Sequence, residues 1–407
     1  MGKKKANGEG SITKRKDGRY MGRYTVDSKR RTVYGDSFEE GRRKINEIAK
    51  GAYIEPNKYS VEKWLRDWLE LYALPTVKRS TYISYEGYVR LHLVPELGQV
   101  KLTSLSTEDL QRFFKKKSGS GTKGGLAPKT LRNIYNMLHA ALDQAVIDRK
   151  IIRNPILGVK LPKVKAKEMR VLSPEEQTAL QEAVSRAEEI HAYGITFAVN
   201  TGLRLGELLG LQWKDVNKKE HCIHIRRTLG RLQKVDEKGR LVQKSAGVTS
   251  TEIVVRSPKS DLSKRKIPLF DELWKDLMAY KEKQDALKDT LGKAYHDEDY
   301  VFATPLGAAC DPKVYQTLFK RVVADAGIEP TNFHALRHTF ATRALESGMD
   351  IKVLSTILGH AQASTTLNLY AHALPDHKKD SMEKMRGHYK SCIGTDNCSV
   401  DTNAEAS

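Results

Sequence analysis

The pattern of hydrophobic and polar positions divides the chain into a short β-rich segment followed by two longer, mainly helical ones. Within residues 1–56, β-forming side chains occur in GSITKRKDGRYMGRYTV and again in RTVYGDSF, on either side of a turn at DSKR. The next stretch, FEEGRRKINEIAKGAYI, has the spacing of a helix. The pattern predicts two or three short strands, which we assign as a three-stranded sheet, and one helix.

Residues 57–156 have the pattern of a helical domain. Val61, Trp64 and Trp68 form one apolar stripe on the first helix, which is more typical of a hydrophobic core than of an aromatic ligand site. A second helix is predicted over Thr81–Leu93. The domain is expected to be a small bundle.

Helix-end signals support this division. Pro95 and Gly98 are expected to end the second helix. Ser106, with an acidic residue three positions later, has the signature of an N-cap, and Pro128 suits the first turn of the last helix. Asn154 with the proline after it closes the domain, and a basic linker follows.

The pattern over residues 170–390 predicts a mixed α/β domain. It opens at Ser173, an N-cap followed by proline and two acids. The stretches CIHI and TEIVV have β-strand composition, and RKIPL is expected to complete one small sheet with them. Residues 391–407 form a polar tail. The chain as a whole is predicted to be mainly α with small β-sheets.

The end of this domain predicts three short helices. ALRHTFATRALESG has helical spacing and stops at Gly348. A second helix is expected over roughly Ile351–Leu358, and a third from Ser364 to Tyr370.

Composition narrows the function classes. The chain has 407 residues, with 70 Lys and Arg against 50 Asp and Glu, so its formal net charge is +20. The first 50 residues alone hold 15 basic and 7 acidic side chains. Such an excess favours a polyanionic partner, because binding is driven by the release of counterions. We therefore expect nucleic acid rather than a merely soluble basic protein.

Cysteine usage and hydropathy predict the compartment. The four cysteines form no CxxC pair, which indicates a reducing cytoplasm without a disulfide framework. No apolar run has the length of a membrane span, and the N-terminus lacks the apolar stretch of a signal peptide. A cytoplasmic protein is the expectation, and the family resemblance given below implies that it is bacterial and DNA-associated.

Two clusters of basic residues are candidates for DNA contact. One lies on the predicted N-terminal strands, where a small packing module with a charged, solvated face is the alternative. The other lies in KKKSGSGTKGG, which is expected to be a flexible basic loop beside DNA, because its glycines fit GxGxxG but lack the flanking strand and helix of a dinucleotide site. The candidates are Arg15, Lys16, Arg19, Arg23, Arg30, Arg31, Lys115, Lys116 and Lys117.

Histidines suggest metal sites at two places, and neither is favoured. His221 and His224 in HCIH could pair, but alternation along a strand explains them better. His334 and His338 have the spacing of zinc helices without the glutamate of HExxH, and Arg337 between them suits an anion better than a cation.

The stretch from Thr331 to His372 combines groups suited to a phosphate. Residues three and four apart share a helix face, so His334, Arg337 and His338 can point at one target. A histidine at the LGH turn and a tyrosine ten residues later follow. Two imidazoles, a fixed cation and a phenol would thus be brought together by short turns.

Five motifs in this order resemble the tyrosine recombinase (phage-integrase) family, most closely in layout the integrases of conjugative transposons. The matching stretches cover roughly residues 170–375. They are TGLRLGELLGL with Arg204, SPKSDLSKRKIPL with Lys259, HALRHTFAT with His334 and Arg337, LGH with His360, and LNLYAH with Tyr370.

The resemblance implies one role for each residue. Tyr370 would attack a DNA phosphodiester and form a 3′-phosphotyrosyl link, with His334 as its base. Arg204 and Arg337 would bind the non-bridging oxygens. Lys259, in competition with Lys264 and Lys266, would protonate the leaving 5′-oxygen.

Three further positions complete the implied site. His360 would hydrogen-bond the phosphate, and Glu207 would orient Arg204. His338 is expected to pack beside the site rather than to act in it. The set requires neither a metal nor a cofactor.

The resemblance also implies the division of labour and the partners. Residues 1–56 would bind arm sites, 57–156 the core site, and 170–390 would carry catalysis. Partners would be double-stranded DNA attachment sites, further copies of the chain from dimer to tetramer, and an excisionase or DNA-bending factor, with no membrane. The implied function is integration or excision of a mobile element. A chromosome-dimer resolvase, a topoisomerase and a non-catalytic DNA-binding protein are the alternatives.

Overall fold

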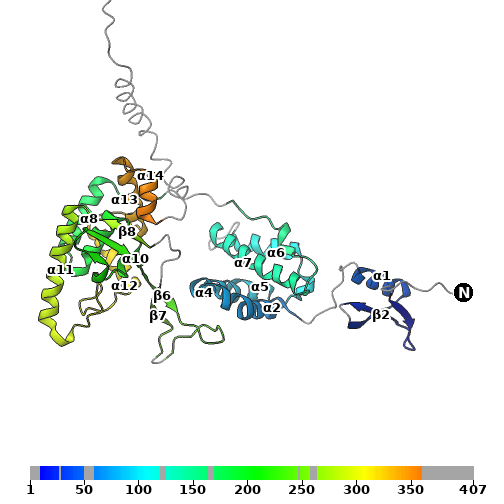
Figure 1. Cartoon of the computed structure of the whole chain (residues 1–407). Helices are drawn as coiled ribbons and strands as arrows, with labels where there is room; N and C mark the ends of the chain where they lie inside the picture. The colour runs from blue at the N-terminus through cyan, green and yellow to red at the C-terminus, as the bar shows by residue number, and fades with distance from the viewer. Residues whose placement is uncertain are drawn as a thin grey trace, which may run out of the picture. The chain divides into compact units, whose positions relative to one another are not determined.

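The structure is a computed structural model, and residue contacts divide the chain into two units (Figure 1). One unit holds residues 1–166 and 233–250, and the other holds residues 167–232 and 251–407. The structure describes residues 10–26, 29–49, 59–119, 125–163, 169–245, 248–256 and 264–359.

The N-terminal element is an antiparallel sheet of three strands with one helix, as the sequence predicted. Strands β1 (Ser11–Lys14), β2 (Tyr20–Val26) and β3 (Lys29–Gly35) pair in that order, and α1 (Phe38–Ala49) packs on them. The buried side chains are those of Tyr24, Val33 and Ile45. A Cβ at Gly22 would lie 2.8 Å from Ile45 Cδ1, so only glycine lets the helix approach this closely.

The helical domain in the same unit has the predicted caps and a continuous core. Its main helices are α2 (Val61–Trp68), α4 (Arg79–Tyr88), α6 (Thr107–Lys117) and α7 (Pro128–Ile147). The Ser60 side chain accepts from Lys63 N, and Ser106 forms a capping box with Asp109. Trp64, Leu65 and Trp68 are buried in the shared core, which confirms the apolar stripe.

The prediction that Pro95 ends the second helix is wrong. The helix continues through a π-helical turn (Val89–Leu93) into α5 (Val94–Leu97). A proline ring clashes with the carbonyl four residues earlier, and the wider turn relieves this because Val94 N bonds to Val89 O five residues back. The same arrangement, with the π-helical turn Leu69–Ala73 and α3 (Leu74–Thr76), surrounds Pro75.

A segment of residues from the predicted catalytic region packs with the helical domain instead. Residues 233–250 belong to the first unit. Tyr82 Oη donates a buried hydrogen bond of 2.9 Å to Gly239 O, and Val235 contacts the helical core. Gly239 has a φ of +76°, and a Cβ there would lie 2.3 Å from the same hydroxyl.

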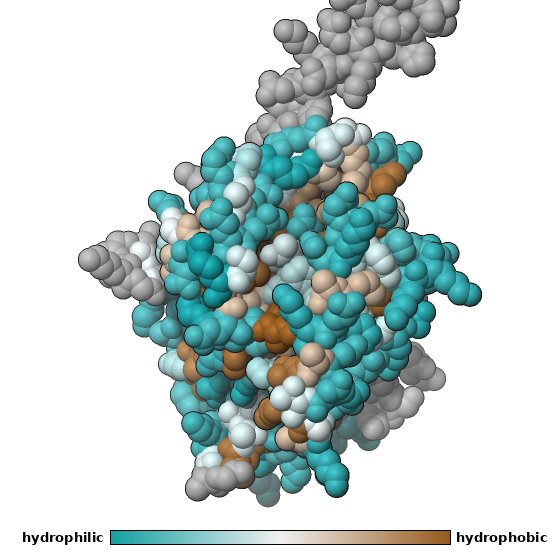
Figure 2. All heavy atoms as spheres, turned by 90° about the vertical axis from the view of Figure 1, so that its left-hand side faces the viewer, coloured by the Kyte–Doolittle hydropathy of each residue, from teal (hydrophilic) through white to brown (hydrophobic). Residues whose placement is uncertain are grey.

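The second unit combines helices with two small sheets. Its helices are α8 (Pro174–Arg186), α9 (Tyr193–Thr201), α10 (Leu205–Leu209), α11 (Asp271–Leu291), α12 (Pro312–Asp325), α13 (His334–Glu346) and α14 (Ile351–Leu358). Hydrophilic residues dominate the face shown in Figure 2, and its apolar patches are small and separate. None of the helices in the described part of the chain is long and apolar enough to cross a lipid bilayer.

The strands of this unit correct one prediction. Strands β4 (Val216–Asn217), β5 (Cys222–Ile225) and β8 (Arg265–Pro268) form a sheet in that order. The stretch TEIVV lies in β7 (Thr251–Arg256), which pairs with β6 (Thr228–Gln233) in a sheet of its own. The expected single sheet is therefore two. Composition identifies strands but does not reveal their partners.

Candidate active site

The site begins at the turn between α9 and α10. Gly202 caps α9 in the left-handed conformation, with a φ of +66°. A Cβ there would lie 2.5 Å from Phe340 Cδ1, so a glycine is required for both reasons. Arg204 follows as the N-cap of α10, and this places its guanidinium beside the buried acid of the next turn.

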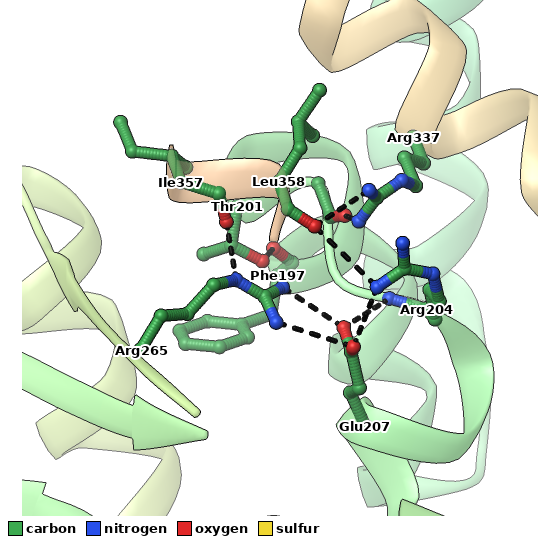
Figure 3. A network of polar contacts seen from close by, with 9 residues as sticks. Phe197, Thr201, Arg204, Glu207, Arg265, Arg337, Ile357 and Leu358 are labelled. Carbon is green, nitrogen blue, oxygen red and sulfur yellow. Dashed lines mark hydrogen bonds and ion pairs between the residues drawn. The ribbon is translucent and has the colours of Figure 1, made fainter. Parts of the chain in front are cut away.

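A buried carboxylate holds two arginines together (Figure 3). Glu207 is 5% exposed, and its oxygens accept hydrogen bonds from Arg265 Nη2 at 2.9 Å and Nη1 at 3.2 Å. Arg204 Nη1 donates to the same carboxylate at 2.8 Å, and the Arg204 backbone N–H does so at 3.1 Å. The Arg204 side chain is still 37% exposed, which leaves part of it open to a ligand.

The pKa of Glu207 reflects these contacts. Burial alone would raise the pKa, because the charged form loses solvation. The hydrogen bonds and positive charges of Arg265 and Arg204 outweigh that effect and hold the pKa at about 2. The carboxylate is therefore ionised at neutral pH and acts as a fixed anchor between the two guanidinium groups.

Arg337 lies beside this pair, buried in α13. It is 2% exposed, and it donates to Gly202 O at 2.8 Å through Nη1 and to Leu358 O at 2.6 Å through Nη2. Arg204 Nη1 lies 3.4 Å from the same Leu358 oxygen. One carbonyl at the end of α14 therefore brings the two arginines next to each other (Figure 3).

The end of α14 is shaped by a glycine. Gly359 is left-handed, with a φ of +65°, and a Cβ there would lie 3.0 Å from Arg265 Nη1. Arg265 Nε also donates to Ile357 O. The α14 C-terminus, Arg265 and Glu207 thus form one continuous network with Arg204 and Arg337.

Two histidines complete the described part of the site. The rings of His334 and His338 meet edge to face, with centroids 4.6 Å apart. Partial desolvation, and then the positive charges of Arg337 and Arg204, lower the pKa of His334. Burial, His334 and Arg337 lower the pKa of His338 to about 4. Both rings are therefore neutral at pH 7, as an acceptor of a proton must be.

A depression of about 950 Å³ opens beside these histidines. Arg170 and Lys320 line it together with His334 and His338. Apolar side chains and Glu329 also line the depression, so its basic groups form one side of a mixed surface next to the histidines.

Comparison with known proteins identifies the family. Residues 170–377, about half of the chain, match the phage integrase family, and residues 60–118 match the N-terminal SAM-like domain of phage integrases. The chain belongs to the phage integrase family. The recombinase class expected from the sequence motifs is thereby confirmed.

Relatives of the integrase family extend over most of the chain. A tyrosine recombinase XerC-like protein of Caldanaerobacter subterraneus subsp. tengcongensis is 28% identical over 370 residues, which cover 88% of this chain and 91% of that one. A transposase from transposon Tn916 of Enterococcus faecalis is 26% identical and covers 95% and 97% of the two chains.

Solved integrase structures share the fold. The integrase of transposon Tn1549, in complex with transposon right end DNA, matches with a TM-score of 0.64 and 24% identity, over 81% of this chain and all of that one. A lambda integrase tetramer bound to a Holliday junction matches with a TM-score of 0.55 and 17% identity, over 89% and 97%. The mainly helical fold class with small sheets is confirmed.

The integrase-family motifs that fall within the described residues lie close together in space. Arg204, Glu207, His334 and Arg337 lie together around the network. Lys259, His360 and Tyr370 lie outside the described residues, as does the predicted third helix from Ser364 to Tyr370.

Lys266, the competitor of Lys259, lies on the wrong face to join this site. Successive side chains of a strand point to opposite faces, and its neighbour Arg265 points to Glu207. Lys266 Nζ instead pairs with Glu220 at 2.8 Å, away from the network. This placement favours Lys259 or Lys264 as the acid.

Sequence reasoning missed Arg265. The signal was present in RKIPL, where Arg265, Ile267 and Leu269 alternate with exposed residues and are all buried. An arginine at an inward position of a strand needs buried acceptors, of which a carboxylate is the one that balances its charge. Nothing in the local pattern indicates that this acceptor is Glu207, 58 residues earlier.

The candidate DNA-contacting residues lie in two places. On the N-terminal sheet, Arg23 and Arg30 are exposed, whereas Arg15 and Arg19 both pair with Asp17 at the turn. Lys16 is exposed beside them, and Arg31 lies on β3.

The second basic group is part of a helix. Lys115, Lys116 and Lys117 form the last turn of α6, where positive charge suits the helix dipole. Glu96 pairs with Lys116 at 2.8 Å and with Lys117 at 3.2 Å. The expected basic loop therefore starts as ordered helix, partly neutralised by this acid.

Proposed function

We propose that the chain cuts and rejoins DNA at specific sites through a phosphotyrosyl intermediate on Tyr370, and so integrates or excises a mobile element. The observation that carries the proposal is the network in which Glu207 and Leu358 O hold Arg204 and Arg337 side by side. Relatives named as an ICEBs1 integrase and a transposase from transposon Tn916 support the mobile-element assignment.

Charge arithmetic supports phosphate as the ligand. Arg204, Arg265 and Arg337 carry three positive charges against the single negative charge of Glu207. A phosphodiester carries one negative charge and gains a second in the pentavalent transition state. A preorganised surplus of two positive charges therefore stabilises the transition state more than the bound substrate.

The proposed step transfers a phosphoryl group without external energy. The Tyr370 oxygen attacks phosphorus while His334 accepts its proton, and the bond to the 5′-oxygen breaks. Lys259 supplies the proton to that oxygen, which leaves as a 5′-hydroxyl. His360 hydrogen-bonds the phosphate. The phosphotyrosyl bond keeps the energy of the broken bond, so a second 5′-hydroxyl can reverse the step on a new partner.

The lowered pKa of His334 fits the role of base. A neutral imidazole is present at pH 7 and can accept the phenol proton, whereas an imidazolium cannot. Partial desolvation of the ring, and then the charges of Arg337 and Arg204, lower this pKa. The same cations would also favour ionisation of a phenol brought beside them.

The remaining parts of the chain would bind DNA and other copies of the chain. Residues 1–56 would hold arm sites and residues 57–156 the core site, with the basic residues above as phosphate contacts. Solved relatives are named as dimers and tetramers on DNA, which supports a homo-oligomer here. An excisionase or DNA-bending factor would set direction, and the bacterial cytoplasm would be the compartment.

The experiment uses a supercoiled plasmid with two copies of a DNA site to which the full chain is first shown to bind. The proposed function predicts exchange between the two sites, with excision or inversion according to their orientation. Relaxation without exchange would instead indicate a topoisomerase. Binding without either product, at several site arrangements, would indicate a DNA-binding protein without catalysis.

A chromosome-dimer resolvase is the second candidate, because the XerC-like relative covers most of both chains. The basic N-terminal sheet argues against it, since it supplies a further DNA-binding element. Exchange that depends on residues 1–56 would separate the two functions in favour of the integrase.

A further inference from the structure

A group of three different metal-ligand side chains lies on the outer face of the sheet β4–β5–β8. Cys222 and His224 are two residues apart on β5, so they point to the same face. Ile223 and Ile225 point to the other face and belong to the hydrophobic core. Glu220 precedes the strand and turns back toward the cysteine.

The distances suit a small tetrahedral ion. Cys222 Sγ lies 3.7 Å from Glu220 Oε2 and 3.9 Å from His224 Nε2, and the ligand atoms of all three residues lie within 4.8 Å of one another. Tetrahedral zinc bonds to sulfur at about 2.3 Å and to nitrogen or oxygen at about 2.0–2.2 Å, which separates such ligand atoms by about 3.5 Å. The two sulfur distances are within a few tenths of an ångström of this value, and rotation of the exposed Glu220 side chain would bring its carboxylate to the ion.

His221 is not part of this group, although the sequence pairs it with His224. Its backbone has a φ of +42°, and its ring stacks on Trp274 with centroids 4.5 Å apart and planes 8° apart. Its Nδ1 lies 3.6 Å from Asp271. His221 therefore lies before the strand and packs on Trp274, so the expected strand alternation does not account for it; alternation instead brings Cys222 and His224 to one face.

A cation already lies against one of the three ligands. Lys266 on β8 is the cross-strand partner of His224, and its Nζ lies 2.8 Å from Glu220 Oε2. Asn217 Nδ2 donates to the same oxygen at 2.9 Å. Glu220 and Lys266 are about half exposed, so a metal ion could displace this ammonium without opening the core.

We propose that Glu220, Cys222 and His224 bind a divalent transition metal of the zinc type, with water as the fourth ligand. One thiolate, one imidazole and one carboxylate are ligands that zinc accepts and that magnesium and calcium do not favour as a set. The site is separate from the phosphate site, because Arg265 and Ile225 face the opposite side of the sheet. Bound metal would brace β5, the strand that pairs with the one carrying Arg265.

Cobalt is the probe, because a cobalt–thiolate bond gives a charge-transfer absorption band that other ligands do not give. The full-length chain carries Cys392→Ser and Cys398→Ser, so that tail cysteines do not contribute. Cobalt titration of the metal-free chain is expected to give this band at one equivalent. Cys222→Ala is expected to abolish it, whereas Cys310→Ala, which removes the other buried thiol, is expected to retain it.

Two exposed positions keep the test independent of folding. Loss of an outer-shell partner alone commonly weakens metal binding by about 10–100-fold, so Glu220→Gln is expected to weaken cobalt binding by at least about tenfold. Lys266→Ala removes the competing ammonium and is expected to tighten binding by about fivefold. A band that persists in Cys222→Ala, no band in the parent chain, or equal cobalt affinity in the parent chain, Glu220→Gln and Lys266→Ala would overturn the proposal.

Discussion

Arg265 anchors the active site through Glu207, and replacing Arg265 should lower the stability of the catalytic domain. The two side chains are 3% and 5% exposed, and two hydrogen bonds of 2.9 and 3.2 Å join them. Arg265→Met keeps most of the aliphatic length and removes the charge. It leaves the Glu207 carboxylate buried with Arg204 as its remaining charged side-chain contact in the network.

The contacts of Glu207 set the size of the stability loss expected for Arg265→Met. Breaking a buried ion pair by removing one partner costs about 3–5 kcal/mol. The shift of the Glu207 pKa from 4.5 to about 2 corresponds to about 3 kcal/mol in favour of the ionised form. Because Arg204 remains as a partner of Glu207, we expect Arg265→Met to lower the free energy of unfolding by about 3 kcal/mol, the lower end of this range. For a domain of roughly 200 residues this lowers Tm by about 6–12 °C.

Differential scanning calorimetry of the full chain measures this loss, because it can separate the transitions of different domains. Arg321→Met is the matched control, since Arg321 pairs with Glu189 at the surface, where an ion pair contributes only about 0–1 kcal/mol. The double variant Glu207→Met with Arg265→Met should be more stable than Arg265→Met, because no unpaired carboxylate remains. If Arg265→Met lowers Tm no more than the control does, the anchoring role is wrong.

Three further predictions concern the site. Arg337→Lys replaces the planar fork that bridges Gly202 O and Leu358 O by a shorter point donor, so DNA cleavage should fall by about 100-fold or more with little change in binding, and equal rates would refute the role. The pKa of His338 falls from about 6.5 unfolded to about 4 folded, so its neutral form stabilises the fold above about pH 6.5 and this stability is lost as pH drops toward 4. His338→Phe should therefore show a smaller fall in Tm between about pH 7 and about pH 4.5 than wild type or the exposed-site control His296→Phe; an equal fall would refute the assignment. Lys259→Ala should lose cleavage on normal DNA and regain it on a 5′-bridging phosphorothioate, whose sulfur leaves without an acid, and failure of this rescue would move the acid elsewhere.

Local signals made parts of the fold predictable. Ser60, Ser106 and Ser173 each cap a helix as expected, because an N-cap depends on the few residues that follow it. The left-handed glycine at 348 also lies where the pattern ended a helix. The prediction that Pro95 ends its helix failed because a π-helical turn relieves the clash of the proline ring. Such a turn has no simple sequence signature.

Contacts between distant segments could not be predicted in the same way. Motif order was enough to associate Arg204 with Arg337, but the shared acceptor Leu358 O and the anchor Arg265 follow from packing. Residues 233–250 join the helical domain through Tyr82, a contact across 157 positions in sequence. Such contacts depend on the whole fold rather than on local propensity.

The most direct test of the central claim is denaturing gel electrophoresis of the chain with a nicked core-site DNA, comparing wild type with Tyr370→Phe. The nick prevents religation, so a covalent protein–DNA adduct should accumulate. We predict an adduct in wild type and none in Tyr370→Phe, with equal DNA binding by both. An adduct in both would show that another residue is the nucleophile, and an adduct in neither on DNA that both bind would contradict catalysis through a phosphotyrosyl bond.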